Sequence, residues 1–176
     1  SFLRIPMAPP AGEGFFLKTG GFATSQGGLK TDHEIFLRCF TDDMKSLMRA
    51  YEDELRAGRT RSDWLAWVRE FADWLLTKER PNGGFIRSWM PRTAEVVSDS
   101  PTGSFMVVPF YAQLYRLTGE QRYLDAAVRT ADFAWNQGQN AGRFVGGTID
   151  NPDVIDKEAA TISLEGYLAL HEITKD

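Results

Sequence analysis

The stretch LYRLTGE at residues 114–120 decides the fold, because it recurs as LHEITKD at residues 170–176. In both copies a run with helical apolar spacing leads into a short polar segment. A second match pairs WL at residues 64–65 with YL at residues 123–124. The repeating unit is about one helical hairpin, which cannot cover its own apolar face and needs a stacked neighbour. The sequence therefore predicts an all-α fold of stacked helical hairpins.

Five helices are expected in the chain as a whole, including those that contain the two copies of the repeat. They run from Thr31 to Gly58, from Ser62 to Pro81, from after Gly103 to about Leu117, from Glu120 to Gly138, and from about Lys157 onward. The third is apolar on nearly every side, which predicts burial. Pro109 should kink that helix or mark its start. Residues 1–30 are rich in Pro and Gly and should be irregular, and residues 85–97 should be short and extended.

The composition is that of a globular protein with ample material for a core. Of its 176 residues 43% are hydrophobic, 25% are charged and 12% are aromatic. Lys and Arg number 20 against 24 Asp and Glu, for a net charge of −4. An acidic chain argues against nucleic acid as a partner, because such binding needs a basic face.

No apolar run approaches the roughly 20 residues that cross a bilayer, so no membrane partner is expected. The single cysteine, Cys39, excludes a zinc site built from several cysteines, and the two histidines exclude a site of three histidines. We expect neither a metal nor a cofactor. A cytoplasmic and a periplasmic location both stay open.

Several motifs resemble the α/α toroid of the six-hairpin glycosidase superfamily: residues 114–120, 123–124, 126–127 and 131–133, and the link Asn82-Gly83-Gly84-Phe85. The resemblance covers about residues 31–176. It implies part of an (α/α)6 toroid, about two and a half of its six hairpins. It also implies an oligosaccharide or polysaccharide substrate, bound where loops lead into the inner helices. The activity it implies is that of a glycoside hydrolase first and a polysaccharide lyase second.

Three acids stand before predicted inner helices, namely Asp32, Asp99 and Asp156. Glycosidic cleavage needs two carboxyl groups about 5 to 10 Å apart, one acting as acid and the other as base or nucleophile. Loops that meet at one end of a toroid bring acids of different hairpins together, so we expect these three to be catalytic. The alternative is that each acid caps N–H groups at the start of a helix.

The expected substrate-binding residues are Trp89, Arg92, His33 and Glu158. An aromatic face stacks on the C–H face of a sugar, and an arginine clamps hydroxyls or a carboxylate. His33 and Glu158 each lie close in sequence to an expected catalytic acid. The alternative for Trp89 is packing over the helix pair.

Two other functions stay open beside the hydrolase. One is a toroid that binds glycans, or serves as a scaffold, without catalysis. The other is an inactive fragment of a larger enzyme. The third hairpin stops at Asp176, where its outer helix should begin. We therefore expect a piece of a longer protein whose last helix exposes apolar surface and either self-associates or is poorly ordered.

Overall fold

A computed structural model describes residues 34–90, 93–148 and 153–175 of the chain. Most of these residues are helical, and they include five α-helices and a small three-stranded sheet. The expectation of a helical chain is therefore confirmed, and the expectation of an all-α chain is wrong for the sheet.

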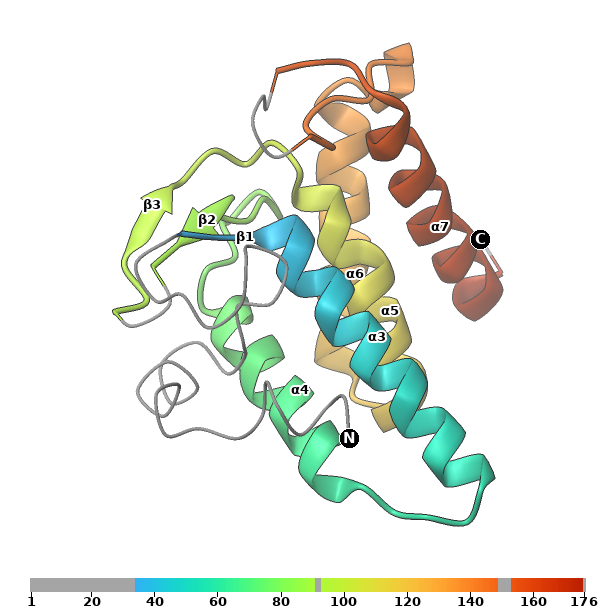
Figure 1. Ribbon diagram of the computed structural model, residues 1–176. Coiled ribbons are helices and arrows are strands. Elements are labelled where there is room, and N and C mark those ends of the chain that lie inside the picture. The colour runs from blue at the N-terminus through green and yellow to red at the C-terminus, as the bar shows by residue number, and fades with distance from the viewer. Residues whose placement is uncertain (1–33, 91–92, 149–152, 176) are drawn as a thin grey trace. The chain divides into compact units, whose positions relative to one another are not determined.

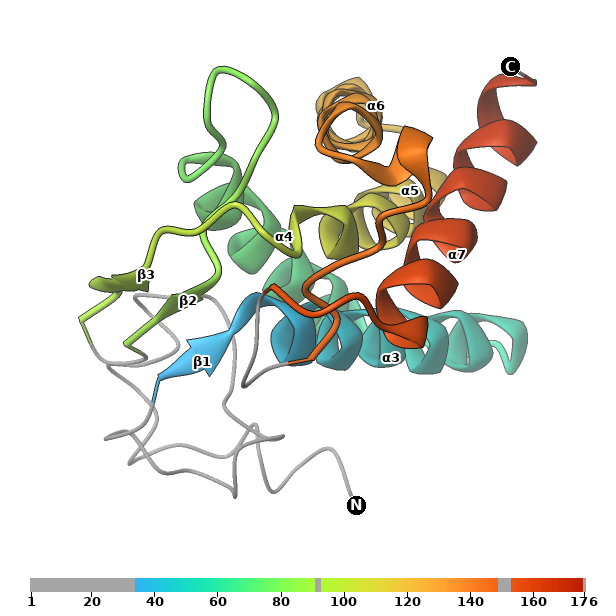
Figure 2. The same cartoon turned by 90° about the horizontal axis from the view of Figure 1, so that it is seen from above.

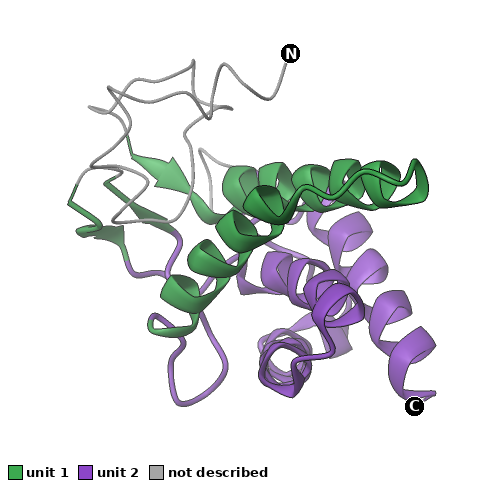
Figure 3. Cartoon of the chain, turned by 90° about the horizontal axis from the view of Figure 1, so that it is seen from below, with its two compact units in different colours: residues 1–77, 88–98 green, residues 78–87, 99–176 purple. Residues whose placement is uncertain are grey.

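The chain divides into two compact units, which Figure 3 colours separately. The first unit comprises residues 1–77 and 88–98, and the second comprises residues 78–87 and 99–176. A helical hairpin lies in each unit, so hairpins are the recurring element of the chain, as the repeat predicts.

The first unit holds one hairpin and the sheet. Its elements are the helices α3 (Leu37–Arg56) and α4 (Ser62–Leu76) and the strands β1 (Ile35–Phe36), β2 (Ser88–Trp89) and β3 (Val96–Ser98). The strands are antiparallel, with β2 in the middle (Figure 1). The second and third strands occupy the segment that was expected to be extended.

Strand β1 corrects the predicted start of the first helix. Its residue Ile35 pairs with Trp89 of β2, and α3 begins at Leu37 rather than near Thr31. The backbone at Phe36 is extended, with φ −94° and ψ 137°. This pairing joins segments far apart in sequence, so local capping signals do not report it.

Aromatic side chains make the core of the first unit. The ring of Trp89 lies 5.0 Å from that of Trp74, 5.8 Å from that of Phe40 and 6.1 Å from that of Phe71, centroid to centroid. These separations lie within the range in which aromatic pairs attract each other. The cluster therefore fixes β2 against both helices of the hairpin.

The second unit is built around one buried helix. Its elements are the 3-10 helix η1 (Ser104–Met106), helices α5 (Val107–Thr118) and α6 (Gln121–Asn136), the 3-10 helix η2 (Gln139–Ala141) and helix α7 (Lys157–Thr174). Both α6 and α7 pack beside α5 (Figures 1 and 2). The buried residues of α5 include Val107, Val108, Phe110, Tyr111, Ala112 and Leu114, so the predicted burial is confirmed.

Pro109 lies in the first turn of α5 and does not interrupt it. The first-turn N–H groups of a helix have no intrahelical acceptor, so the missing proline donor costs nothing there. The repeat also reappears at two helix ends. Gly119 after α5 and Lys175 after α7 both have left-handed backbones, with φ 72° and 65°.

Gly166 allows α7 to lie close to α5. A Cβ at this position would come within 2.9 Å of Val108 Cγ1 and 3.2 Å of Pro109 Cδ. Neither neighbour is the end of a flexible side chain, so the two helices would have to move apart.

We expect Gly166→Ala to lower the free energy of unfolding by about 1–3 kcal/mol, because overpacking outweighs the gain in helix propensity. Urea unfolding followed by circular dichroism measures the change. The control is Thr161→Ala at an exposed position of the same helix, which should alter stability by less than about 1 kcal/mol. A Gly166→Ala variant more stable than the parent would contradict the close approach.

Candidate functional site

Asp99 follows the last strand of the first unit and belongs to the second unit. Its side chain is 86% exposed, and its Oδ2 lies 3.5 Å from Nη2 of Arg80. The same guanidinium donates a hydrogen bond to the main-chain oxygen of Asp99. The carboxylate is thus open to solvent beside one arginine.

Asp156 is the N-cap of α7. Its Oδ1 accepts a hydrogen bond of 2.8 Å from the N–H of Ala159, and its Oδ2 accepts one of 2.9 Å from the N–H of Gly147. Glu158 lies half-buried in the first turn of the same helix, where its charge suits the helix dipole. The capping alternative therefore describes Asp156 in this structure.

Of the expected site residues, Asp156 and Glu158 come together at the start of α7. Within the described part of the chain, no hydrogen bond or ion pair joins Asp99 to either of them. Asp32, His33 and Arg92 lie outside the described residues.

Trp89 belongs to the first unit and is fully buried. Its ring is nearly parallel to that of Phe71, with 28° between the planes, and it meets Phe40 edge-on. No ring face is open for a sugar, so the packing alternative describes Trp89.

The second unit contains two adjoining hollows beside the C-terminal half of α6. The larger, of about 370 Å³, is lined by Pro81, Asn82, Arg129, Asp132, Phe133, Asn136 and Gln137. This volume falls within the roughly 300–1,000 Å³ that small-molecule sites occupy. Amide, carboxylate and guanidinium groups share its wall with one aromatic ring, so both hydrogen-bond donors and acceptors are present.

A tight turn forms one wall of the larger hollow. Gly83 has φ 86°, and a Cβ there would lie 2.5 Å from the carbonyl oxygen of Arg129. Glycine therefore brings Pro81 and Asn82 directly onto α6. Glu79, just before the turn, accepts two hydrogen bonds from Arg129, of 2.7 and 2.8 Å, which raise the pKa of that guanidinium.

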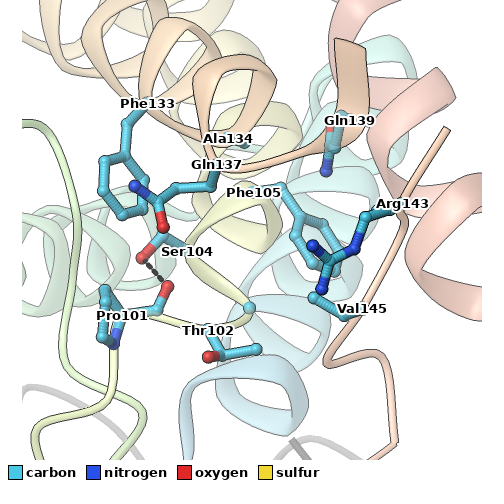
Figure 4. Close-up of a pocket in the computed structure, with 11 residues that line it drawn as sticks. Pro101, Thr102, Ser104, Phe105, Phe133, Ala134, Gln137, Gln139, Arg143 and Val145 are labelled. Carbon is cyan, nitrogen blue, oxygen red and sulfur yellow. Dashed lines mark hydrogen bonds between the residues drawn. The ribbon is translucent and has the colours of Figure 1, made fainter. Parts of the chain in front are cut away.

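The smaller hollow, of about 80 Å³, lies between the start of η1 and the end of α6 (Figure 4). Its lining residues are Pro101, Thr102, Gly103, Ser104, Phe105, Phe133, Ala134, Gln137, Gln139, Arg143 and Val145. Phe133 and Gln137 line both hollows. The two hollows therefore share part of their lining.

Hydrogen bonds of Arg87 and Ser104 fix the loop that forms one wall of the smaller hollow. Arg87 is buried, and its guanidinium donates to the carbonyl oxygens of Thr148, at 2.6 Å, and Thr102, at 3.4 Å. Ser104 donates to the carbonyl of Pro101, at 2.6 Å, and accepts from the N–H of Phe85, at 2.8 Å. The loop before η1 is thus fixed from two sides.

Gln139 is held by two residues of α7. Its Nε2 donates to Oγ of Ser163 at 2.8 Å, and its Oε1 accepts from the hydroxyl of Tyr167 at 2.5 Å. Burial and, secondarily, the charge of Asp132 raise the pKa of Tyr167 to about 12. The hydroxyl therefore stays protonated at neutral pH and fixes which end of the amide is the acceptor.

Sequence reasoning missed the residues of both hollows as ligand-binding residues. Asn82 and Asp132 belong to the motifs that carry the toroid resemblance, so they were interpreted as features of the fold and not as residues of a site. A signal was present in the sequence, because residues 81–85 match residues 140–144 at the offset of 59 that also pairs residues 64–65 with residues 123–124. Each of these segments contributes lining residues.

No protein-family model matches the chain, and no curated protein matches it in sequence. Among the described residues, no three His, Cys, Asp or Glu side chains are grouped to hold a metal ion. The described helices include none that combines the length and the apolar character needed to span a membrane. The chemistry of the two hollows is thus the basis for assigning a function.

We expect Tyr167→Phe to lower stability by about 1–3 kcal/mol at pH 7, because Gln139 Oε1 loses its buried donor. The pKa of Tyr167 is about 12 in the folded chain, and an exposed tyrosine in the unfolded chain titrates near 10. The contribution of Tyr167 is therefore complete below pH 10 and is lost as the pH rises toward 12. Urea unfolding of both proteins from pH 7 to 12 should show the difference shrinking above pH 10. A difference that stays constant to pH 12 would contradict the raised pKa.

Proposed function

We propose that the chain binds a saccharide at the two hollows of its second unit and belongs to a carbohydrate-active protein. The observation that carries this proposal is the lining of the larger hollow. This lining combines the amides of Asn82, Asn136 and Gln137 with the carboxylate of Asp132, beside the buried side chain of Phe133. Sugar hydroxyls both donate and accept hydrogen bonds, so this mixture of donors and acceptors suits a neutral sugar ring.

The charges of the larger hollow support an uncharged ring there. Arg129 is engaged by Glu79 through two hydrogen bonds, so its charge is largely compensated. Asp132 offers acceptor oxygens for hydroxyl groups from an exposed position on α6.

We further propose that the hairpins belong to part of an (α/α)6 toroid spanning about residues 31–176. The support is the hairpin in each unit and the matching left-handed ends of α5 and α7. On α7, Leu164 and Leu168 are 58% and 53% exposed, at repeat positions that α5 fills with buried residues. Self-association through this face stays a prediction.

The catalytic form of the proposal is hydrolysis of a glycosidic bond by paired carboxylates, with Asp99 and Asp156 as the pair. Their place before helical segments of the second unit and the open carboxylate of Asp99 support it. The alternative is glycan binding without catalysis. Asp156 favours that alternative, because both of its oxygens already accept backbone N–H groups.

Saccharide binding is tested by titrating the labelled full chain with cello-, xylo- and manno-oligosaccharides and following backbone amide NMR shifts. We expect shifts at residues 129–137 for at least one series. Asp132→Ala and Asn136→Ala should each weaken that binding about threefold to tenfold, the range for one neutral hydrogen bond. Asp125→Ala removes the same charge from an exposed site on α6 outside the hollow and should leave binding unchanged. Equal losses in the aspartate variants would contradict the site.

Catalysis is tested by releasing reducing ends from the oligosaccharide that binds. We expect Asp99→Asn and Asp156→Asn each to lower the rate at least about 100-fold, the lower limit for loss of an acid or base. Asparagine can still cap Ala159 N–H but cannot accept from Gly147 N–H as well, so urea unfolding of Asp156→Asn is measured beside its rate to separate a structural loss from a catalytic one. Binding without turnover, or full rates in both variants, would leave glycan binding as the function and exclude the acid pair.

A further inference from the structure

The smaller hollow differs from the larger one in its charge. Among the described residues that line it, Arg143 alone carries a formal charge. Within the described part of the chain, its guanidinium makes no hydrogen bond or ion pair, and Figure 4 shows it beside the hollow. Asp156, which follows the bridge partner of Val145, keeps both oxygens on backbone N–H groups.

Gln139 and Thr102 add donors to the smaller hollow, and the amide of Gln137 adds both donors and an acceptor. Gln139 uses its Oε1 for Tyr167 and one Nε2 hydrogen for Ser163, which leaves its second Nε2 hydrogen. The hydroxyl oxygen of Thr102 accepts from Ser100, so its own hydrogen is left to donate. With the five N–H groups of the guanidinium, this set of donors suits a group with several acceptor oxygens and a negative charge.

The volume of the smaller hollow suits a small chemical group rather than a whole sugar ring. The 80 Å³ of the smaller hollow exceeds the roughly 10–15 Å³ that one water needs but falls well below the roughly 300 Å³ at which small-molecule sites begin. A carboxylate fits this space, and a sugar ring attached to it would extend past the shared residues Phe133 and Gln137.

We propose that the smaller hollow binds the carboxylate of an acidic sugar through Arg143 and Gln139, while the sugar ring occupies the larger hollow. This inference rests on the proposed saccharide binding and names its substrate class. Ser163 and Tyr167 are positioning residues, because they orient Gln139 without lining the hollow.

The test compares pairs of ligands that differ at one carbon. Methyl β-glucuronide and methyl β-glucoside, and the corresponding galacto pair, are titrated into the full chain and followed by amide NMR shifts. We expect at least one uronide to bind about tenfold more tightly than its neutral partner, the lower limit for a charge-assisted hydrogen bond. Raising the salt concentration from 0.05 to 0.5 M should weaken binding of the uronide and leave binding of the neutral glycoside unchanged.

Arg143→Gln should abolish the preference, because uronide binding then falls to the affinity of the neutral glycoside. Arg122→Gln removes the same charge at the start of α6, about 21 Å along the helix from its C-terminal end, and should keep the preference. Inorganic phosphate is titrated in parallel, because a guanidinium also binds free phosphate.

The outcomes separate the two proposals. Equal binding of uronide and glycoside, or a preference that survives Arg143→Gln, overturns the carboxylate site and leaves saccharide binding in place. Uronide binding that depends on Arg143 but is unchanged by Asp132→Ala keeps the carboxylate site and overturns the place of the ring. Phosphate binding through Arg143 without uronide binding makes the hollow a phosphate site and overturns the inference. If the parent chain binds neither uronides nor neutral glycosides, both the carboxylate site and the proposed saccharide binding are overturned.

Discussion

Helix α5 has apolar side chains on nearly every side, and this constraint organises the second unit. Each such side chain contributes about 1.5–3 kcal/mol when it is removed from water, so the helix needs a cover on more than one side. Helix α6 supplies one cover, where Tyr111 and Tyr123 stack at 5.8 Å with 10° between their rings. Helix α7 supplies another through the close approach at Gly166.

Covering α5 also creates the two hollows. The loop before η1 leads directly into α5, and the turn at Pro81 rests on α6, so both loops are fixed by the helices they approach. The end of α6 and the following η2 lie between these loops and supply lining residues to both hollows. Polar hollows thus arise where three connecting segments meet the end of one helix, and loops of this kind often carry function.

The sequence predicted four helices well and misplaced the start of the first. Periodic apolar residues and a capping Asp156 are local signals, and they located α4, α5, α6 and α7 to within a few residues. The sheet depends on Ile35 meeting Trp89, which local patterns do not encode. The repeat suggested hairpins because a glycine such as Gly119 marks the end of a helix. The left-handed backbone needed there favours glycine, so the residue type is visible in the sequence.

The candidate site was harder to predict, because acids at helix starts have a structural use as well as a chemical one. Asp156 shows this, since its carboxylate caps α7 and also ties down Gly147. Trp89 shows the same for aromatic residues, since an exposed platform and a core ring look alike in a sequence. Arg143 lies in the second of two matching glycine-rich segments, but its role as the only formal charge among the described lining residues of the smaller hollow depends on the loops around it, which the match does not report.

The close contact at Gly166 has a consequence beyond packing. Ser163 and Tyr167, which hold Gln139, flank this glycine on the same helix, so the depth at which α7 seats on α5 also sets where the amide lies. Among homologous sequences, substitutions at positions 139, 163, 166 and 167 should therefore be correlated. Such correlated change would let the polar lining of the smaller hollow evolve through a helix that does not itself line it.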